Sequence, residues 1–97
     1  MSNKITFTVL IKSVPGKSDE LKTAIVELIG HTIKEPGCEL FKVFQHNEDP
    51  EQFTLWEIFI SQQAMQEHMA KDYTQDYFSL GLALETKGIQ HSDIYAS

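Results

Sequence analysis

A short apolar strand that leads directly into a helix constrains this chain more than any other stretch. Residues 53–59 alternate between two faces and predict a strand, and Ser61 is placed to cap the helix that follows. One face of the strand is expected to carry Phe53, Leu55, Glu57 and Phe59. Glu57 and, on the helix, His68 then lie on apolar faces, although carboxyl and imidazole groups are costly to bury unless they are paired or used. We therefore expect any chemistry to lie here.

The first third of the chain predicts a strand and a helix. Residues 5–11 alternate between two faces, as a half-buried strand does. Pro15-Gly16 turns the chain, and Ser18 is expected to cap the next helix. The apolar positions of this helix recur with the spacing of one buried face, which predicts that it packs against a sheet. These positions are Leu21, Ala24, Ile25, Leu28, Ile29 and Thr32.

The middle of the chain predicts a β-hairpin. Pro36 and Gly37 end the first helix, because proline cannot continue a helix and glycine accepts a left-handed exit. Residues 38–45 predict a second strand with apolar side chains on both faces, and residues 46–52 carry the turn-forming residues of a loop. The strand at 53–59 is therefore expected to return antiparallel to the second strand.

The last third predicts a further helix and a weak strand. Asp72 and Gln75 have the spacing of a capping box, which indicates a third helix at a new angle after the second. Its inner face is expected to hold Tyr73, Tyr77, Leu80, Gly81 and Leu84. Lys87 and Gly88 would end this helix, and residues 89–95 predict a polar strand that suits a sheet edge.

The predicted order of elements is β-α-β-β-α-α-β. This is the split βαβ arrangement of an α+β, ferredoxin-like sandwich, in which an antiparallel sheet has helices on one face. We expect residues 1–97 to form a single domain, since a chain of this length supplies one core. The other sheet face keeps apolar residues that no helix is left to cover. Two such sheets packed face to face would bury them, so the sequence predicts a homodimer.

The charge and the cysteine content narrow the classes of function. Fourteen acidic residues against eight basic ones give a net charge of −6, which repels phosphate backbones and anionic lipid surfaces. We therefore expect neither a nucleic-acid partner nor a membrane. Cys38 is the only cysteine, and no pair of histidines has metal-ligand spacing, so neither a disulfide nor a metal site is predicted. With no long apolar segment, the chain is expected to be cytoplasmic.

His68 is the candidate catalytic acid or base. An unperturbed imidazole titrates near ~6.5 and exchanges a proton under ordinary conditions. Glu57 is expected either to orient His68 by a hydrogen bond or to act as a cavity carboxylate, with the first role favoured. The alternative for both residues is a buried pair with only a structural role. Trp56 points to the opposite sheet face and is assigned to the dimer core.

Four aromatic residues are candidate substrate contacts. Tyr73 and Tyr77 bring hydroxyl groups to the cavity side of the third helix, where they could hydrogen-bond a carbonyl or phenolate oxygen. Phe41 and Phe59 are expected to form apolar walls. The alternative for the tyrosines is core filling, with the hydroxyls at the rim. The chain has no glycine-rich phosphate loop, so no flavin or nicotinamide cofactor is assigned.

Several short motifs occur in an order that is shared with a known family. They are Val14-Pro15-Gly16-Lys17, Glu35-Pro36-Gly37-Cys38, Asp49-Pro50, Phe53-x-Leu55-Trp56-Glu57 and Ser61-x-x-Ala64-x-x-x-His68. In these motifs the chain resembles the antibiotic biosynthesis monooxygenase (ABM) family of dimeric α/β-barrel proteins. The resemblance implies a homodimer whose sheets join into a barrel, with a cavity between sheet and helices in each subunit.

The resemblance also implies a range of activities. Family members include cofactor-independent oxygenases of quinols and anthrone-like phenols, a haem-degrading branch and an isomerase branch. The haem-degrading branch carries Trp and His at the positions of Phe59 and Phe78, so haem cleavage is not expected here. A Pro-His pair often follows the helix histidine, and Asp72-Tyr73 replaces it in this chain, so a two-histidine proton relay is not expected either.

The sequence therefore favours a cofactor-independent monooxygenase that acts on a quinol, an anthrone-like compound or another enolisable small molecule. His68, oriented by Glu57, would take a proton from the substrate, and the resulting anion would react with dioxygen in an apolar cavity. One alternative is an isomerase of a small carbonyl metabolite. The other is a non-catalytic dimer that binds a small apolar ligand or serves in a stress response.

Overall fold

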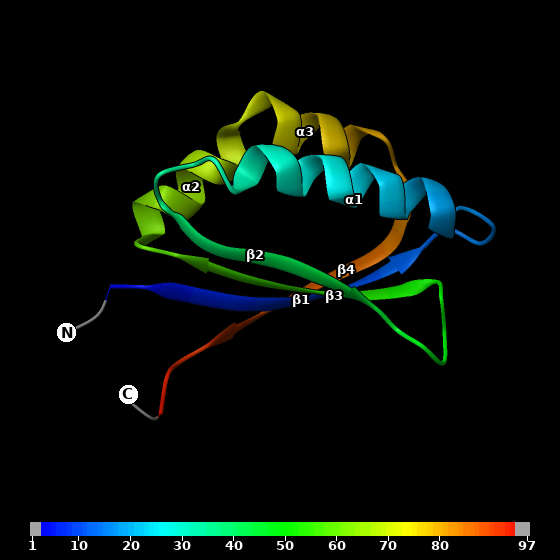
Figure 1. The fold of residues 1–97 in the computed structure, drawn as a ribbon, viewed down its shortest axis with the longest axis horizontal. Helices are drawn as coiled ribbons and strands as arrows, with labels where there is room; N and C mark the ends of the chain where they lie inside the picture. The colour runs from blue at the N-terminus through cyan, green and yellow to red at the C-terminus, as the bar shows by residue number, and fades with distance from the viewer. Residues whose placement is uncertain (1–2, 95–97) are drawn as a thin grey trace.

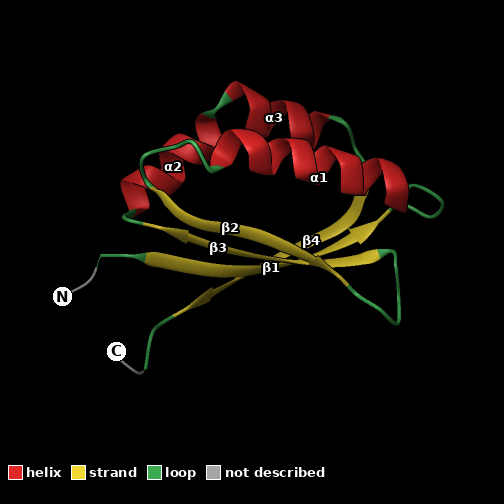
Figure 2. Ribbon diagram, in the orientation of Figure 1, coloured by secondary structure: helices red, strands yellow, loops and turns green. Residues whose placement is uncertain are grey.

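The chain folds into one antiparallel sheet with three helices on one of its faces (Figure 1 and Figure 2). The computed structural model describes residues 3–94. The elements follow in the order β1 (Ile5–Ser13), α1 (Ser18–Thr32), β2 (Cys38–Gln45), β3 (Gln52–Phe59), α2 (Gln62–Ala70), α3 (Asp72–Ser79) and β4 (Ala83–His91). This arrangement confirms the predicted α+β class, the ferredoxin-like order and the placement of all helices on one face.

The strand order β2-β3-β1-β4 places the strand that carries Glu57 inside the sheet. All three strand pairings are antiparallel, and Glu57 of β3 lies opposite Phe7 of β1 and Phe41 of β2. Because side chains alternate along a strand, these three residues point to the same face, which is the face toward the helices. The last strand, β4, lies at a sheet edge, as its polar sequence predicts.

The core lies between this sheet face and α1. The predicted apolar stripe of α1 is confirmed, because Leu21, Ile25, Leu28 and Thr32 are all buried. The Thr32 hydroxyl donates a hydrogen bond of 2.8 Å to the Leu28 carbonyl, so the only polar side chain of this buried stripe is satisfied within the helix. Thr32 can therefore be buried beneath α1 without an unsatisfied hydroxyl.

The predicted helix starts are confirmed at one of three sites. The Ser61 hydroxyl accepts a hydrogen bond of 3.1 Å from the Ala64 backbone N–H, so it caps α2 as expected. Ser18 is instead the first residue of α1, and the cap position before it makes no side-chain hydrogen bond. The capping box at Asp72 does not form either. Lys71 occupies the cap position of α3 and makes no side-chain hydrogen bond there, and Asp72 is already the first residue of the helix.

The predicted end of the third helix is wrong. The helix stops at Ser79, and Gly81 takes a left-handed backbone with φ of +63°, which turns the chain into β4. Leu80 and Leu84 are exposed and do not belong to an inner helix face. The run of leucine, glycine and alanine in this stretch fits a helix and a strand equally well, so its periodicity did not separate the two. The end of the predicted strand at 95 lies outside the described residues.

The turn after α1 packs against α2 more closely than a side chain would allow. A Cβ atom added at Gly37 would lie 2.5 Å from the Cβ of Ala64 on α2. The Gly37 carbonyl also accepts a hydrogen bond of 2.9 Å from the Ile60 N–H. This close approach brings the end of α1 beside α2, although the two segments are far apart in sequence.

Gly37→Ala is expected to lower the free energy of unfolding by about 1–3 kcal/mol, because the added methyl group must displace the turn or α2. Gly30→Ala is the matched control, since its added methyl group meets no other atom within 4 Å. It removes a glycine from a helix interior and is expected to stabilise by roughly 0.5–1 kcal/mol. Equilibrium urea denaturation measures both changes. Equal stability of Gly37→Ala and the original chain would contradict the close packing.

The sheet face that points away from the helices exposes large apolar side chains. Trp56 is 42% exposed on this face, as the strand alternation predicts, and Leu10, Phe44 and Ile89 are exposed with it. An apolar face of this kind is typical of a protein contact surface.

Within residues 3–94, no helix is both long enough and apolar enough to cross a membrane.

Candidate functional site

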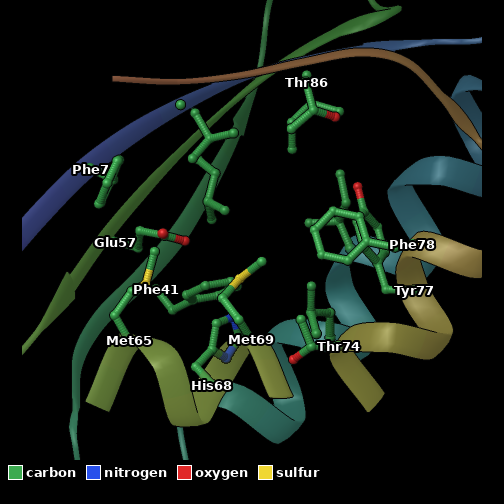
Figure 3. A pocket seen from close by; sticks show the side chains of 16 residues that line it. Phe7, Phe41, Glu57, Met65, His68, Met69, Thr74, Tyr77, Phe78 and Thr86 are labelled. Atoms are coloured by element: carbon green, nitrogen blue, oxygen red, sulfur yellow. The ribbon is translucent and has the colours of Figure 1, made fainter. Parts of the chain in front are cut away.

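A cavity of about 180 Å³ lies between the sheet and the helices (Figure 3). Its lining is largely apolar and comes from β1, β2, β3, β4 and all three helices. Glu57 reaches into it from the sheet and His68 from α2, while Tyr77 and Phe78 approach from α3 (Figure 3). Glu57 and His68, the two ionisable residues that were singled out in the sequence, therefore line the same cavity.

His68 is held by a carboxylate that lies outside this cavity. The side chain is only 3% exposed, and its Nδ1 lies 2.9 Å from Oε2 of Glu35. A carboxylate can only accept a hydrogen bond, so Nδ1 carries the proton in this pair. Nε2 of His68 has no hydrogen-bond partner among residues 3–94. This nitrogen therefore makes no hydrogen bond within the described part of the chain.

The predicted hydrogen bond between Glu57 and His68 is not formed. Glu35 takes its place because the turn at Gly37 packs against α2 and brings the end of α1 beside His68. Glu35 entered the sequence analysis only as part of a motif. One local signal could have identified it, since an acidic side chain just after a helix C-terminus opposes the helix dipole and needs another reason to be there.

Glu57 is a cavity carboxyl without a hydrogen-bond partner in the described part of the chain. It is 5% exposed, and burial raises its pKa from 4.5 to about 7. At neutral pH the group is therefore divided between its acid and its base form. This corresponds to the cavity role that the sequence left open for Glu57, rather than to the orienting role.

The two candidate tyrosines have different positions. Tyr77 lines the cavity, its hydroxyl is buried without a partner within residues 3–94, and burial raises its pKa to about 12. It is therefore a protonated hydrogen-bond donor with no acceptor. Tyr73 does not line the cavity, which corrects its predicted role as a substrate contact. Its hydroxyl donates to Oε2 of Glu35, and its ring stacks on His31 with centroids 4.9 Å apart.

Of the two candidate phenylalanines, only one lines the cavity. Phe41 lines the cavity as predicted, with its ring centroid 5.3 Å from that of His68. Phe59 is fully buried and is not part of the cavity lining, so its predicted role as a wall is wrong. Its ring packs on His68 instead, with centroids 5.0 Å apart. Phe59 thus fixes the plane of the imidazole rather than touching a ligand.

Thr74 is a cavity residue that the sequence analysis missed. It lies on α3 next to Tyr73, and its hydroxyl is buried without a partner among the described residues. A threonine on a helix gives no sequence signal for this role, because helical threonines commonly bond to their own backbone.

Residues 3–94 contain no group of three or more His, Cys, Asp or Glu side chains placed to hold a metal ion.

The sheet, the helices and the cavity between them define a small α+β protein whose cavity is lined by one carboxyl and one imidazole group. Residues 5–79 match the antibiotic biosynthesis monooxygenase (ABM) family profile, which covers most of the chain. The chain therefore belongs to the antibiotic biosynthesis monooxygenase family. No curated protein sequence matches it.

Solved structures of similar proteins share the whole fold. Protein PA3566 of Pseudomonas aeruginosa is 21% identical with a TM-score of 0.92, over 98% of each chain. Protein SO0527 of Shewanella oneidensis is 28% identical with a TM-score of 0.87, over 94% of this chain and 91% of that one. A protein of Nitrosomonas europaea, named provisionally as an antibiotic biosynthesis monooxygenase, is 20% identical with a TM-score of 0.89, over 98% and 94%.

Folding stability is expected to depend on pH through Glu57. The folded chain retains a proton that the unfolded chain releases between pH 4.5 and about 7, so the free energy of unfolding falls as the pH rises through this range. The full loss is of the order of 3 kcal/mol. Urea denaturation from pH 4.5 to 8 measures it. Glu57→Gln should remove this slope, while the exposed control Glu67→Gln should keep it. Identical slopes in all three proteins would contradict the assignment.

Proposed function

We propose that this protein is a cofactor-independent monooxygenase of electron-rich phenols, with a single-ring hydroquinone as the substrate class. Membership of the monooxygenase family supports the reaction type. The single observation that carries the proposal is His68, which lines a largely apolar cavity, with Nδ1 bonded to Glu35 and Nε2 without a partner among residues 3–94. That arrangement suits a base that takes a proton from a substrate hydroxyl.

The reaction begins when Nε2 of His68 accepts the proton of a hydroquinone O–H. The resulting anion gives electrons to dioxygen and forms a carbon–oxygen bond at the neighbouring ring carbon, which leaves a hydroperoxide. Loss of water from this hydroperoxide breaks the O–O bond and yields a hydroxyquinone. One dioxygen is consumed and one water released for each hydroquinone. The neutral form of Glu57 is placed to give a proton to the departing oxygen.

The cavity volume favours one aromatic ring over the three fused rings of an anthrone. An apolar cavity of about 150 Å³ is known to bind benzene, and the volume here is about 180 Å³. The buried hydroxyls of Thr74 and Tyr77 have no partner in the part of the chain that the structure describes, so they are available to bond the oxygens of such a ring. Donors with no acceptor inside the protein are costly to bury, so a polar ligand would satisfy them.

His68→Ala is expected to lower dioxygen uptake on methyl-substituted and unsubstituted hydroquinones by about 10²–10⁴-fold, because it removes the base. An oxygen electrode measures the uptake, corrected for oxidation without protein. The control is His46→Ala, since His46 lies outside the cavity and bonds to Thr54. Uptake by folded His68→Ala that equals the original rate would remove His68 from the mechanism.

A second function is favoured by Glu57. A carboxyl with a pKa of about 7 and the imidazole of His68 line the same cavity, which suits proton transfer between two carbons of a small carbonyl compound without dioxygen. Conversion of such a compound at an equal rate under nitrogen would support the isomerase. Ligand binding with no turnover in either assay would support the non-catalytic dimer.

We also propose that the protein is a homodimer joined through its sheets. Leu10, Phe44, Trp56 and Ile89 are exposed together on the sheet face that carries no helix. A second copy of the same face would cover them, and the family resemblance implies this mode of pairing.

Trp56→Glu is expected to convert the dimer into a monomer, because it places a charge on the face that the partner would bury. Sedimentation equilibrium measures the mass. Val26→Glu is the control, since it adds the same charge to an exposed apolar position on α1. A monomeric original chain, or an equal effect of both substitutions, would contradict the proposed interface.

A further inference from the structure

Glu35 joins three helices at one buried oxygen. It follows the end of α1, and its Oε2 lies 2.9 Å from Nδ1 of His68 on α2. The same oxygen accepts a hydrogen bond from the hydroxyl of Tyr73 on α3. The Glu35 side chain is only 9% exposed and does not line the cavity. Glu35 therefore does not touch a ligand in the cavity, and its nearest link to the cavity is the hydrogen bond to His68.

We propose that Glu35 is the positioning residue of this site. It holds His68 in the tautomer with the proton on Nδ1 and the lone pair on Nε2, and it supplies the negative charge that balances His68 when that ring gains a proton. The catalytic consequence rests on the proposed function, but the tautomer is a property of the protein without any substrate.

The tautomer follows from the hydrogen bonds of the two ring nitrogens. A neutral imidazole carries one N–H, and the partner of one nitrogen decides where that proton lies. Glu35 is the only hydrogen-bond partner of either nitrogen of His68 within residues 3–94. Without it, nothing in this part of the chain would keep Nε2 free of the proton.

Tyr73 explains why the carboxylate keeps this geometry. Two donors on one oxygen resist rotation of the Glu35 side chain, and the stack of Tyr73 on His31 holds the second donor in place. Burial and the Glu35 carboxylate both raise the pKa of Tyr73, so its hydroxyl keeps the proton that it donates. Tyr73 therefore stabilises the position of Glu35 from outside the cavity, whereas the sequence predicted that it contacts the substrate.

The two carboxyls near His68 have different functions for a physical reason. Glu35 accepts two hydrogen bonds, from His68 and from Tyr73, and lies outside the cavity. Glu57 accepts none in the described residues, and burial raises its pKa to about 7. Glu35 is thus suited to act as a fixed hydrogen-bond acceptor for His68, and Glu57 to exchange a proton inside the cavity.

The tautomer can be measured by long-range ¹H–¹⁵N NMR at a pH where the imidazole is neutral, with the His68 signals assigned from their absence in His68→Ala. We expect the original chain to show the Nδ1–H form and Glu35→Ala to shift toward Nε2–H. Glu35→Leu, which fills the same volume without an acceptor, replaces Glu35→Ala should that variant unfold. An Nε2–H form in the original chain, or no shift in the variants, would overturn the proposal.

The kinetic effect separates positioning from general packing. Glu35→Gln keeps the shape of the side chain and removes its charge, so kcat for a hydroquinone should fall at least about tenfold with little change in KM. Glu67→Gln is the control, because Glu67 is an exposed neighbour of His68 on α2. Unchanged kcat in Glu35→Gln would overturn the charge-balancing role. Absence of turnover in the original chain would contradict the proposed monooxygenase function but not the positioning role of Glu35, because the NMR experiment tests that role without a substrate.

Discussion

The arrangement of the site depends on the contact between Glu35 and His68. Both side chains are buried, and a buried ion pair seldom adds net stability, because removing two polar groups from water costs more than their attraction returns unless further hydrogen bonds satisfy them. The hydroxyl of Tyr73 supplies such a bond. The contact joins the ends of α1, α2 and α3 above the sheet, and it leaves one nitrogen of His68 for the cavity.

The backbone makes this contact possible through one close approach, that of Gly37 to α2. Absence of a side chain at Gly37 lets the turn after α1 lie against Ala64, one helical turn before His68. The sheet register places Glu57 between Phe7 and Phe41, so the cavity floor carries one carboxyl among aromatic rings. The helices thus position His68, and the sheet positions Glu57.

Local patterns were sufficient to predict most of the fold from the sequence. Residue patterns located the first three strands, and alternation in β3 placed Glu57 and Trp56 on opposite faces, whereas β4 begins six residues before the predicted start at residue 89. The apolar spacing of α1 and the cap at Ser61 identified two helices. The end of α3 was not predictable, because residues 80–84 suit either period and Gly81 alone decides the turn. Short apolar runs are ambiguous for this physical reason.

The site was predictable only in part, because its contacts join distant segments. His68, Glu57, Phe41 and Tyr77 line the cavity, as the faces of their elements indicated. The partner of His68 depends on how closely α1 approaches α2, which no local pattern specifies. The sequence therefore assigned Glu57 as the partner of His68, whereas the partner is Glu35. It also placed Tyr73 in the cavity, whereas Tyr73 bonds to Glu35 outside it.

A crystal structure of the protein soaked with hydroquinone would decide whether His68 acts on a ligand in this cavity. We expect one ring between the sheet and the helices, with an oxygen within hydrogen-bond distance of Nε2 of His68 and a second near the hydroxyl of Thr74 or Tyr77. An empty cavity in which Nε2 is bonded to a group of the protein would show that His68 is a structural residue, and the catalytic interpretation would then fail.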